Sequence, residues 1–248
     1  MKICWNIKKS IKTNVKVTKG EEIMKVGYAI LYEDGELVIS KNHTILLKKI
    51  AINYGEFEDT DVPWKNEIEK IEKVQILDQV KSNCMKAWFI DCLNLTTLIN
   101  FKDLDTSDCT DFSEMFYNCQ SLQELNELQN WNVSNGTDFT YMFAYCESLQ
   151  DLNELQTWDI SNGTNFSYMF AFCLSLQDLN ELQTWDISNG TEFLDMFYNC
   201  KSLAEISLSD TLNILTIEMF ELCNPKLKIH WKNHIYTYAD LLEYQTIY

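Results

Sequence analysis

The chain has 248 residues, of which 46% are hydrophobic and 13% aromatic, so it is long and apolar enough to bury a core and is not expected to be disordered. Its formal net charge of −17 is concentrated, because residues 103–200 hold 17 acidic residues and no lysine, and arginine is absent throughout. This charge disfavours nucleic acids and anionic membranes as partners and favours a basic protein, although acids that only confer solubility remain the simpler interpretation.

Residues 1–25 form a basic leader with seven lysines and two glutamates. The leader lacks the apolar run of a signal peptide, and no stretch of the chain approaches the roughly 18 apolar residues that span a bilayer. We therefore expect a cytoplasmic or virion-associated protein without membrane insertion.

Residues 26–82 are predicted to form a β-rich N-terminal cap. The stretch YAILYEDGELVIS indicates a hairpin around Asp34 and Gly35, since Asp-Gly is a preferred hairpin turn.

Residues 83–223 contain an internal repeat. A cysteine recurs at intervals of 27, 27, 27, 27 and 23 residues, with phenylalanine three positions before it every time and methionine four positions before it in five of six copies. Leucine follows three positions after most of these cysteines: Leu95, Leu122, Leu149, Leu176 and Leu203. A period of 20–29 residues with recurring leucines is typical of leucine-rich repeats, whose units bury their apolar faces by stacking.

Each repeat is expected to contain one short parallel strand and one short helix. SLQDLNEL is the predicted strand and TNFSYMFAFC the predicted helix, with Met and Phe pointing inward. Gly136, Gly163 and Gly190 are expected in a left-handed turn, and the threonine after each glycine is an N-cap candidate. The fold prediction is an α/β solenoid, a leucine-rich-repeat stack of short parallel strands and short helices.

The cysteines are predicted to be buried, reduced and structural. No C-x-x-C pair exists among the nine, and parallel neighbours in a stack seldom present thiols to one another. An odd number of cysteines also fits a reducing compartment better than a disulfide-bonded exterior.

Residues 224–248 are predicted to be a C-terminal cap with a last strand and a short closing helix. His230 and His234 have a spacing that would suit zinc on a helix, but LKIHWKNH indicates a strand running into a turn, and no third ligand is near. No metal, cofactor or catalytic constellation is expected.

The repeat WNVSNGTDFTYMFAYCESLQDL resembles that of the BspA-like leucine-rich-repeat surface proteins, whose typical unit reads W-D-T-S-N-V-T-x-M-x-x-M-F-x-x-C-x-x-L. The resemblance extends from Ala87 to about Leu227, and the Pro-Trp segment of the predicted N-terminal cap resembles the N-terminal module of that family. This chain has glycine at the family's valine, and Phe112, Phe139, Phe166 and Phe193 at its first methionine. The resemblance implies a leucine-rich-repeat fold and adhesion or host-protein recognition at a bacterial or phage surface.

Two columns of carboxylates and a column of amides are the candidate partner-binding residues. If the strands stack in parallel, like side chains lie about 5 Å apart along the sheet, where like charges repel and a basic partner would relieve them. The first acid column is Glu124, Asp151, Asp178 and Glu205; the second acid column is Glu127, Glu154 and Glu181; the amide column is Asn126, Asn153 and Asn180.

Three functions remain open. The leading hypothesis is a non-enzymatic protein-binding module for recognition or adhesion by a bacterial or phage surface-type protein. The alternative is an intracellular, phage-encoded interaction protein that sequesters a basic host partner. An enzyme with its site in the N-terminal cap is the third, for which we can name no catalytic residues. The sequence does not indicate an oligomeric state.

Overall fold

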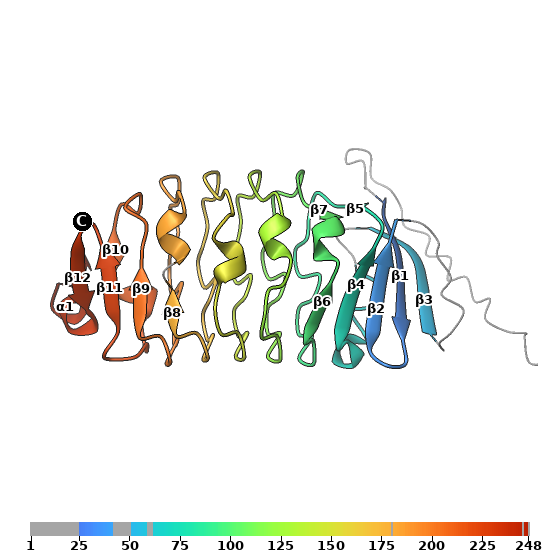
Figure 1. Cartoon of the computed structure of the whole chain (residues 1–248), viewed down its shortest axis with the longest axis horizontal. Helices are drawn as coiled ribbons and strands as arrows, with labels where there is room; N and C mark the ends of the chain where they lie inside the picture. Colours follow the sequence, from blue (N-terminus) through green and yellow to red (C-terminus); the bar gives the residue numbers. More distant parts are fainter. Residues whose placement is uncertain (1–24, 42–50, 59–61, 180, 245, 248) are drawn as a thin grey trace, which may run out of the picture.

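The structure, a computed structural model, describes residues 25–41, 51–58, 62–179, 181–244 and 246–247. The predicted basic leader lies outside these ranges, apart from Lys25. Figure 1 shows the described chain as a row of coils stacked between a sheet at the N-terminal end and a small cap at the C-terminal end. Its strands are β1 Lys25–Tyr32, β2 Glu36–Ser40, β3 Ala51–Glu58, β4 Lys73–Leu77, β5 Val80–Lys81, β6 Thr97–Ile99, β7 Leu104–Asp105, β8 Asp178–Leu179, β9 Glu205–Ser207, β10 Leu215–Thr216, β11 Lys228–Trp231, β12 His234–Thr237 and β13 Thr246–Ile247.

Helical structure in the described residues is short. One α-helix, α1 at Tyr238–Tyr244, lies after the last predicted repeat. The remaining helices are single turns of 3-10 type: η1 Ile68–Lys70, η2 Phe101–Asp103, η3 Leu128–Asn130, η4 Asn153–Leu155, η5 Glu181–Thr184 and η6 Ile217–Phe220.

The N-terminal sheet confirms the predicted hairpin. Strands β1 and β2 pair in antiparallel fashion, and Gly35 takes a left-handed φ of 78° in the turn between them, a conformation that glycine adopts without strain. The sheet runs β3-β1-β2-β4-β6, and β2, β4 and β6 are parallel. Its parallel strands therefore continue directly into the first coil.

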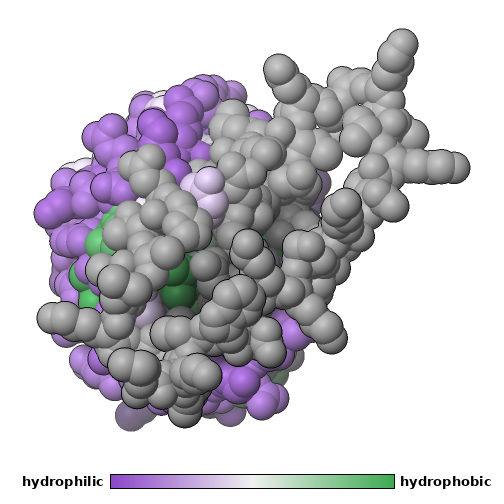
Figure 2. Space-filling view, turned by 90° about the vertical axis from the view of Figure 1, so that its right-hand side faces the viewer, coloured by the Kyte–Doolittle hydropathy of each residue, from purple (hydrophilic) through white to green (hydrophobic). Residues whose placement is uncertain are grey.

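Trp64 joins this sheet to the first coil. Its indole Nε1 donates a hydrogen bond of 2.7 Å to the carbonyl of Trp88, and its rings lie 6.1 Å from Phe89 in a stacked arrangement. Trp64 is fully buried, so the Pro-Trp motif seals one end of the repeat core. Figure 2 views this end of the molecule, where the described residues that can be seen are mainly hydrophilic, with a few hydrophobic ones among them.

Successive coils contact one another in parallel and in constant register. Single parallel bridges link Cys84, Asp111, Asp138, Asn165 and Glu192, each 27 residues from the next. Further along the chain, β8, β9 and β11 form a parallel sheet, and β12 closes it as an antiparallel edge. The predicted last strand and closing helix are confirmed by β11 and α1.

The helix predicted before each cysteine is absent from the first five repeats, and only the segment before Cys223 contains a short one, the 3-10 turn η6. Residues 138–146 and their counterparts in those five repeats form mainly consecutive turns, with left-handed φ of 57° at Tyr141 and 62° at Tyr145. Alternate N–H groups bond locally and to the next coil: Met142 N–H donates to Phe139 O, whereas Phe143 N–H donates to Met169 O. A helix would satisfy the same groups within one coil, so this segment exchanges intrasegment hydrogen bonds for bonds between coils.

The predicted strand is only partly present. Asp178–Leu179 is a strand, whereas the equivalent residues at Glu124 and Asp151 have extended or irregular backbone outside any strand. Neighbouring coils are still joined just before this point, because Ser148 N–H donates to Gln120 O.

The interior columns predicted from the repeat are confirmed. Each repeat cysteine, the phenylalanine three positions before it and the methionine four positions before it are buried, with at most 6% of any of them exposed. Phe143 and Phe170 lie 5.8 Å apart with parallel rings, and Phe139 and Phe166 lie 5.5 Å apart in a second column. Each ring is therefore stacked on the equivalent ring of the next coil.

Polar side chains of the repeat bind the backbone of the preceding coil. Trp158 Nε1 donates to Leu128 O at 2.8 Å, Asn162 Nδ2 donates to Ser134 O at 2.8 Å, and the Cys146 thiol lies 3.2 Å from Phe116 O. Equivalent contacts recur for Trp131, Trp185, Asn135, Asn189, Cys119, Cys173 and Cys200. The recurrence of these Trp, Asn and Cys residues in the sequence is thus explained by hydrogen bonds between coils.

The repeat glycines are required by packing and not by a left-handed turn. Among the described glycines, Gly35 alone has positive φ. A Cβ on Gly163 would lie 2.3 Å from Cζ of Phe166, and the same close approach occurs at Gly136 and Gly190. The following threonine is not a helix cap either, because Thr164 Oγ1 donates to Thr137 O in the preceding coil.

This packing predicts coupled effects at Gly163 and Phe166. We expect Gly163→Val to cost about 1–3 kcal/mol of unfolding free energy, because the ring must leave its position. Adding Phe166→Met restores the Val–Met pair of the pattern that the chain resembles, and should recover about 1 kcal/mol or more relative to additivity. Urea denaturation of the two single variants and the double variant measures this coupling; simple additivity would contradict it.

The buried thiols are predicted to be unreactive in the folded chain. Burial raises the pKa of Cys92, Cys109 and Cys146 to about 12, and the thiolate is the reactive form. At pH 8 we expect iodoacetamide to modify these three residues at least about 100-fold more slowly than in denaturant. Peptide mass spectrometry gives the rate at each cysteine, with half-exposed Cys84 as the reference in the same sample.

Candidate functional site

The first acid column lies on the coil surface directly after the buried leucines. Glu124 and Asp151 are exposed, whereas Glu205 is half-buried in β9. Asp178 in β8 is the backbone partner of Glu205, so the structure brings these two positions side by side. Of the amide column, Asn126 and Asn153 are exposed, and Asn180 lies outside the described residues.

Described members of the first acid column have local partners. Asn126 Nδ2 donates to Glu124 Oε2 at 2.8 Å, and the backbone N–H of Asn153 donates to Asp151 Oδ1 at 3.1 Å. Glu205 Oε1 lies 2.5 Å from His230 Nε2. This column and the amide column therefore satisfy part of their own hydrogen-bonding capacity.

The second acid column is less well satisfied. Glu127, Glu154 and Glu181 are half-buried at the start of, or within, the turns η3, η4 and η5. Within the described residues, Oε2 of Glu127 and Oε2 of Glu181 are buried without a hydrogen-bond partner. A buried carboxylate oxygen without a donor is unfavourable by about 1–3 kcal/mol, so this column gains most from a cation.

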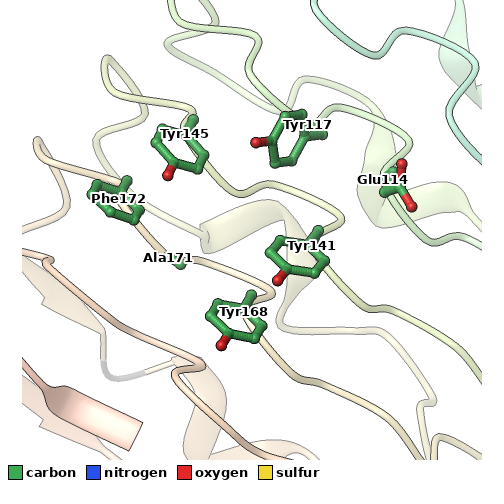
Figure 3. A pocket seen from close by; sticks show the side chains of 7 residues that line it. All are labelled: Glu114, Tyr117, Tyr141, Tyr145, Tyr168, Ala171 and Phe172. Atoms are coloured by element: carbon green, nitrogen blue, oxygen red, sulfur yellow. The ribbon is translucent and has the colours of Figure 1, made fainter.

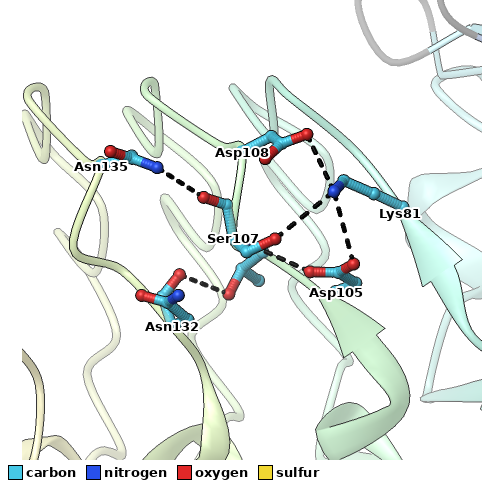
Figure 4. A network of polar contacts seen from close by, with 7 residues as sticks. Lys81, Asp105, Ser107, Asp108, Asn132 and Asn135 are labelled. Carbon is cyan, nitrogen blue, oxygen red and sulfur yellow. Dashed lines mark hydrogen bonds and ion pairs between the residues drawn. The ribbon is translucent and has the colours of Figure 1, made fainter.

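Lysine pairs with the acidic stretch only at its start, as far as the described residues show. Lys81 Nζ lies 2.8 Å from Asp108 and 3.6 Å from Asp105, as Figure 4 shows. Lys86 lies 3.7 Å from Glu114, and Lys102 lies 3.9 Å from Glu127. Among the residues that the structure describes, the acids of the later coils up to residue 200 have no such lysine pairs.

The ion pairs and hydrogen bonds around Lys81 lie at the solvent surface and shift the pKa values of the groups that take part in them. A hydrogen bond to Asp108 raises the pKa of Lys81, and the hydroxyl of Ser107 lowers the pKa of Asp105. Asn135 Nδ2 donates to Ser107 O at 2.7 Å (Figure 4), which attaches the next coil to the same network.

A second candidate surface is a hollow of about 360 Å³ on the segment of each coil that precedes the cysteine. Figure 3 shows its walls, which come from three successive coils. We call it the aromatic hollow; its lining residues are Glu114, Tyr117, Tyr141, Tyr145, Tyr168, Ala171 and Phe172.

The backbone conformation places the aromatic side chains in two outward columns. Tyr141 and Tyr168 occupy one left-handed position, and Tyr145 and Phe172 occupy the other, four residues later in each coil. These four side chains are half-buried, whereas the adjacent Met and Phe side chains between them are buried in the core. The turns therefore separate an interior face from an aromatic exterior face.

The rings of the aromatic hollow hold one another in place. Tyr141 and Tyr168 are stacked with centroids 4.5 Å apart, and Tyr145 and Phe172 with centroids 4.2 Å apart. Tyr117 meets Tyr145 edge-on at 5.4 Å. Stacking across coils fixes these side chains and reduces the entropy lost on binding.

Negative charge surrounds the tyrosine hydroxyls. A hydrogen bond to Asp195 raises the pKa of Tyr168 to about 12. Burial, with smaller contributions from neighbouring tyrosines and carboxylates, raises the pKa of Tyr117; burial likewise raises the pKa of Tyr141. The raised pKa values of Tyr117, Tyr141 and Tyr168 mean that their hydroxyls resist ionisation, and the hollow disfavours anions.

The sequence analysis did not predict the aromatic hollow. Tyr141 and Tyr145 are spaced as neighbours on a helix, and we assigned that segment to a helix packed on the core. Aligning the outward positions of successive repeats is the signal that would have found it, because aromatic residues recur there 27 residues apart.

His230 contacts Glu205, but no group of three His, Cys, Asp or Glu side chains in the described part of the chain is arranged to hold a metal ion. None of the helices described is long and apolar enough to span a membrane.

Comparison with known families identifies the repeats. The family described as "Mycoplasma protein of unknown function, DUF285" matches residues 83–210, which is just over half of the 248 residues. The chain therefore belongs to this family. No curated protein matches the chain significantly.

The solved structures similar to this chain are leucine-rich-repeat proteins. A leucine-rich cell surface protein from Faecalibacterium prausnitzii A2-165 is 16% identical with a TM-score of 0.42. The match covers 86% of this chain and 52% of the Faecalibacterium chain. A leucine-rich-repeat protein from Bacteroides ovatus ATCC 8483 is 14% identical with a TM-score of 0.32, and covers 89% of this chain and 69% of its own. The chain thus spans about half the length of the Faecalibacterium protein.

Proposed function

We propose that this member of the DUF285 family is a non-enzymatic protein-binding module, a leucine-rich-repeat solenoid that presents its acid columns to a basic partner. The second acid column supports this proposal most directly. Its half-buried carboxylates recur at one position of each coil, and those of Glu127 and Glu181 retain buried oxygens without donors. Cationic side chains of a partner would pair with the exposed part of these half-buried carboxylates and offset their charge.

The charge of the neighbouring coils supports the same proposal. Residues 103–200 contain no lysine, and the lysines that pair with this stretch in the described residues contact its first members alone. A field of one sign attracts a basic partner and accelerates its association. We assign no catalytic step to the chain.

The setting of this binding is a further proposal with two versions. The first is recognition or adhesion at a bacterial or phage surface, the location for which the Faecalibacterium protein is named. The second is capture of a basic host protein inside a cell. Free buried cysteines favour the second version, because a reducing compartment maintains thiols in that state.

Charge reversal of the second acid column tests the proposal. We expect the triple variant Glu127→Lys, Glu154→Lys and Glu181→Lys to bind a basic probe protein, cytochrome c, at least tenfold more weakly than the original chain at 0.05 M salt. At about 0.5 M salt the screening length falls to roughly 4 Å, and binding by the original chain should be lost as well. Surface plasmon resonance measures both effects.

A variant with equal net charge provides the control. Reversing Glu147, Glu192 and Glu218 changes the total charge by the same amount at positions outside both acid columns. If the two triple variants lose cytochrome c binding equally, net charge alone explains the binding and the proposal fails. A Glu→Gln triple at the column positions, with urea denaturation of every variant, separates loss of binding from loss of folding.

A further inference from the structure

We propose that the aromatic hollow is a second binding site, which accepts a cationic side chain, arginine or lysine, from an extended segment of a protein partner. It is formed by residues before each repeat cysteine, whereas both acid columns are formed by residues after it. The two sites therefore consist of different residues and can fail independently.

The size and shape of the hollow fit a side chain. Its volume of about 360 Å³ is open to solvent and lined by seven residues from three coils. Figure 3 shows Tyr141 beside Tyr168 and Tyr145 beside Phe172, with Tyr117 and Glu114 on the far wall. The rings of each stacked pair cover one another's facing sides, so a guanidinium group can lie flat over an outer ring face, whereas a folded element of a partner is too large to enter.

The rings supply the attraction that a cation needs. The face of an aromatic ring is electron-rich, and a cation within about 6 Å of its centre gains about 0.5–2 kcal/mol. Two stacked pairs, with centroid distances of 4.5 and 4.2 Å, present adjacent rings on neighbouring coils. Stacking holds these rings in position before the ligand arrives.

Carboxylates at both ends of one column give the hollow its charge preference. The outward position occupied by Tyr141 and Tyr168 is held by Glu114 in the preceding coil and by Asp195 in the following coil. Lys86 approaches Glu114 to only 3.7 Å, with both side chains substantially exposed, so it neutralises this carboxylate weakly. Asp195 raises the pKa of Tyr168, the direction expected where a negative field favours added positive charge.

Other ligands fit these observations less well. A purely apolar segment would gain nothing from Glu114 and Asp195, and an anion would be repelled. A neutral oligosaccharide would stack on the rings and bond the carboxylates, and it is therefore included as an alternative outcome of the test.

Binding of a peptide pair tests the proposal on the full chain. The probes are fluorescent acetyl-(Gly-Arg)4-amide and the same peptide with citrulline, which keeps the shape of arginine without its charge. We expect the arginine peptide to bind at least tenfold more tightly than the citrulline peptide in fluorescence polarisation at 0.1 M salt. Equal binding of the two peptides would overturn the proposal.

Ring removal locates the binding. The double variant Tyr145→Leu and Phe172→Leu should bind the arginine peptide at least fivefold more weakly, whereas Tyr145→Phe, which keeps the ring face, should stay within about twofold of the original chain. Leucine is compatible with this backbone position, because Leu222 occupies it in the last coil with φ of 59°. Thermal denaturation confirms that each variant is folded.

The remaining outcomes separate this site from the proposed function. Unweakened peptide binding by the leucine variant would remove the hollow as the site, and competition by maltohexaose would indicate a carbohydrate ligand instead. If the leucine variant binds the peptide normally while the second-column variant loses cytochrome c, the proposed function stands without the hollow. If instead the leucine variant loses peptide binding, and reversal of the second acid column leaves cytochrome c binding unaffected, the hollow stands as a binding site and the proposed function fails.

Discussion

The fold depends on hydrogen bonds that pass from one coil to the next. In the segments before Cys92, Cys119, Cys146 and Cys173, every second N–H donates to the following coil, and side chains of Trp, Asn, Thr and Cys contact backbone carbonyls of the preceding coil. A single coil leaves these groups without partners and exposes its apolar face, so neither its turns nor its core is stable alone. The left-handed turns, the stacked rings and the outward tyrosines all follow from this mutual support.

The sequence predicted the interior well because burial leaves a pattern in apolar spacing. The recurrence of Met, Phe and Cys identified the columns that the structure buries, and Asp34-Gly35 identified the first hairpin. The predicted helices failed for a physical reason. Met and Phe four and three positions before the cysteine also suit a helix, and the bonds that decide against it go to residues 26 positions away, such as Phe143 to Met169. The acid columns remain a prediction, with part of their local surroundings now described.

Two departures from the resembled repeat pattern have one cause. Glycine at positions such as Gly163 and phenylalanine at positions such as Phe166 occur together because the ring occupies the space of the missing side chain. Cys109 stands at the equivalent position before Phe112, so a small side chain is accepted in the first coil. Relative to the resembled pattern, side-chain volume is lost at the glycine and gained at the phenylalanine three positions later. The phenylalanines form a second stacked aromatic column in the core.

The coils have left-handed backbone at outward positions where the residue type can vary without changing the fold, in contrast to the residues that form the core. Alanine, aspartate, glutamate, asparagine, tyrosine, phenylalanine and leucine all occupy these outward places with φ between 53° and 62°, and none of them supplies an inter-coil ring of the core. Exchanging one of these residues for another changes the exposed chemistry of that coil and leaves its backbone arrangement unchanged. The stack is therefore a constant scaffold with variable exposed residues, so its recognition properties can be altered one coil at a time.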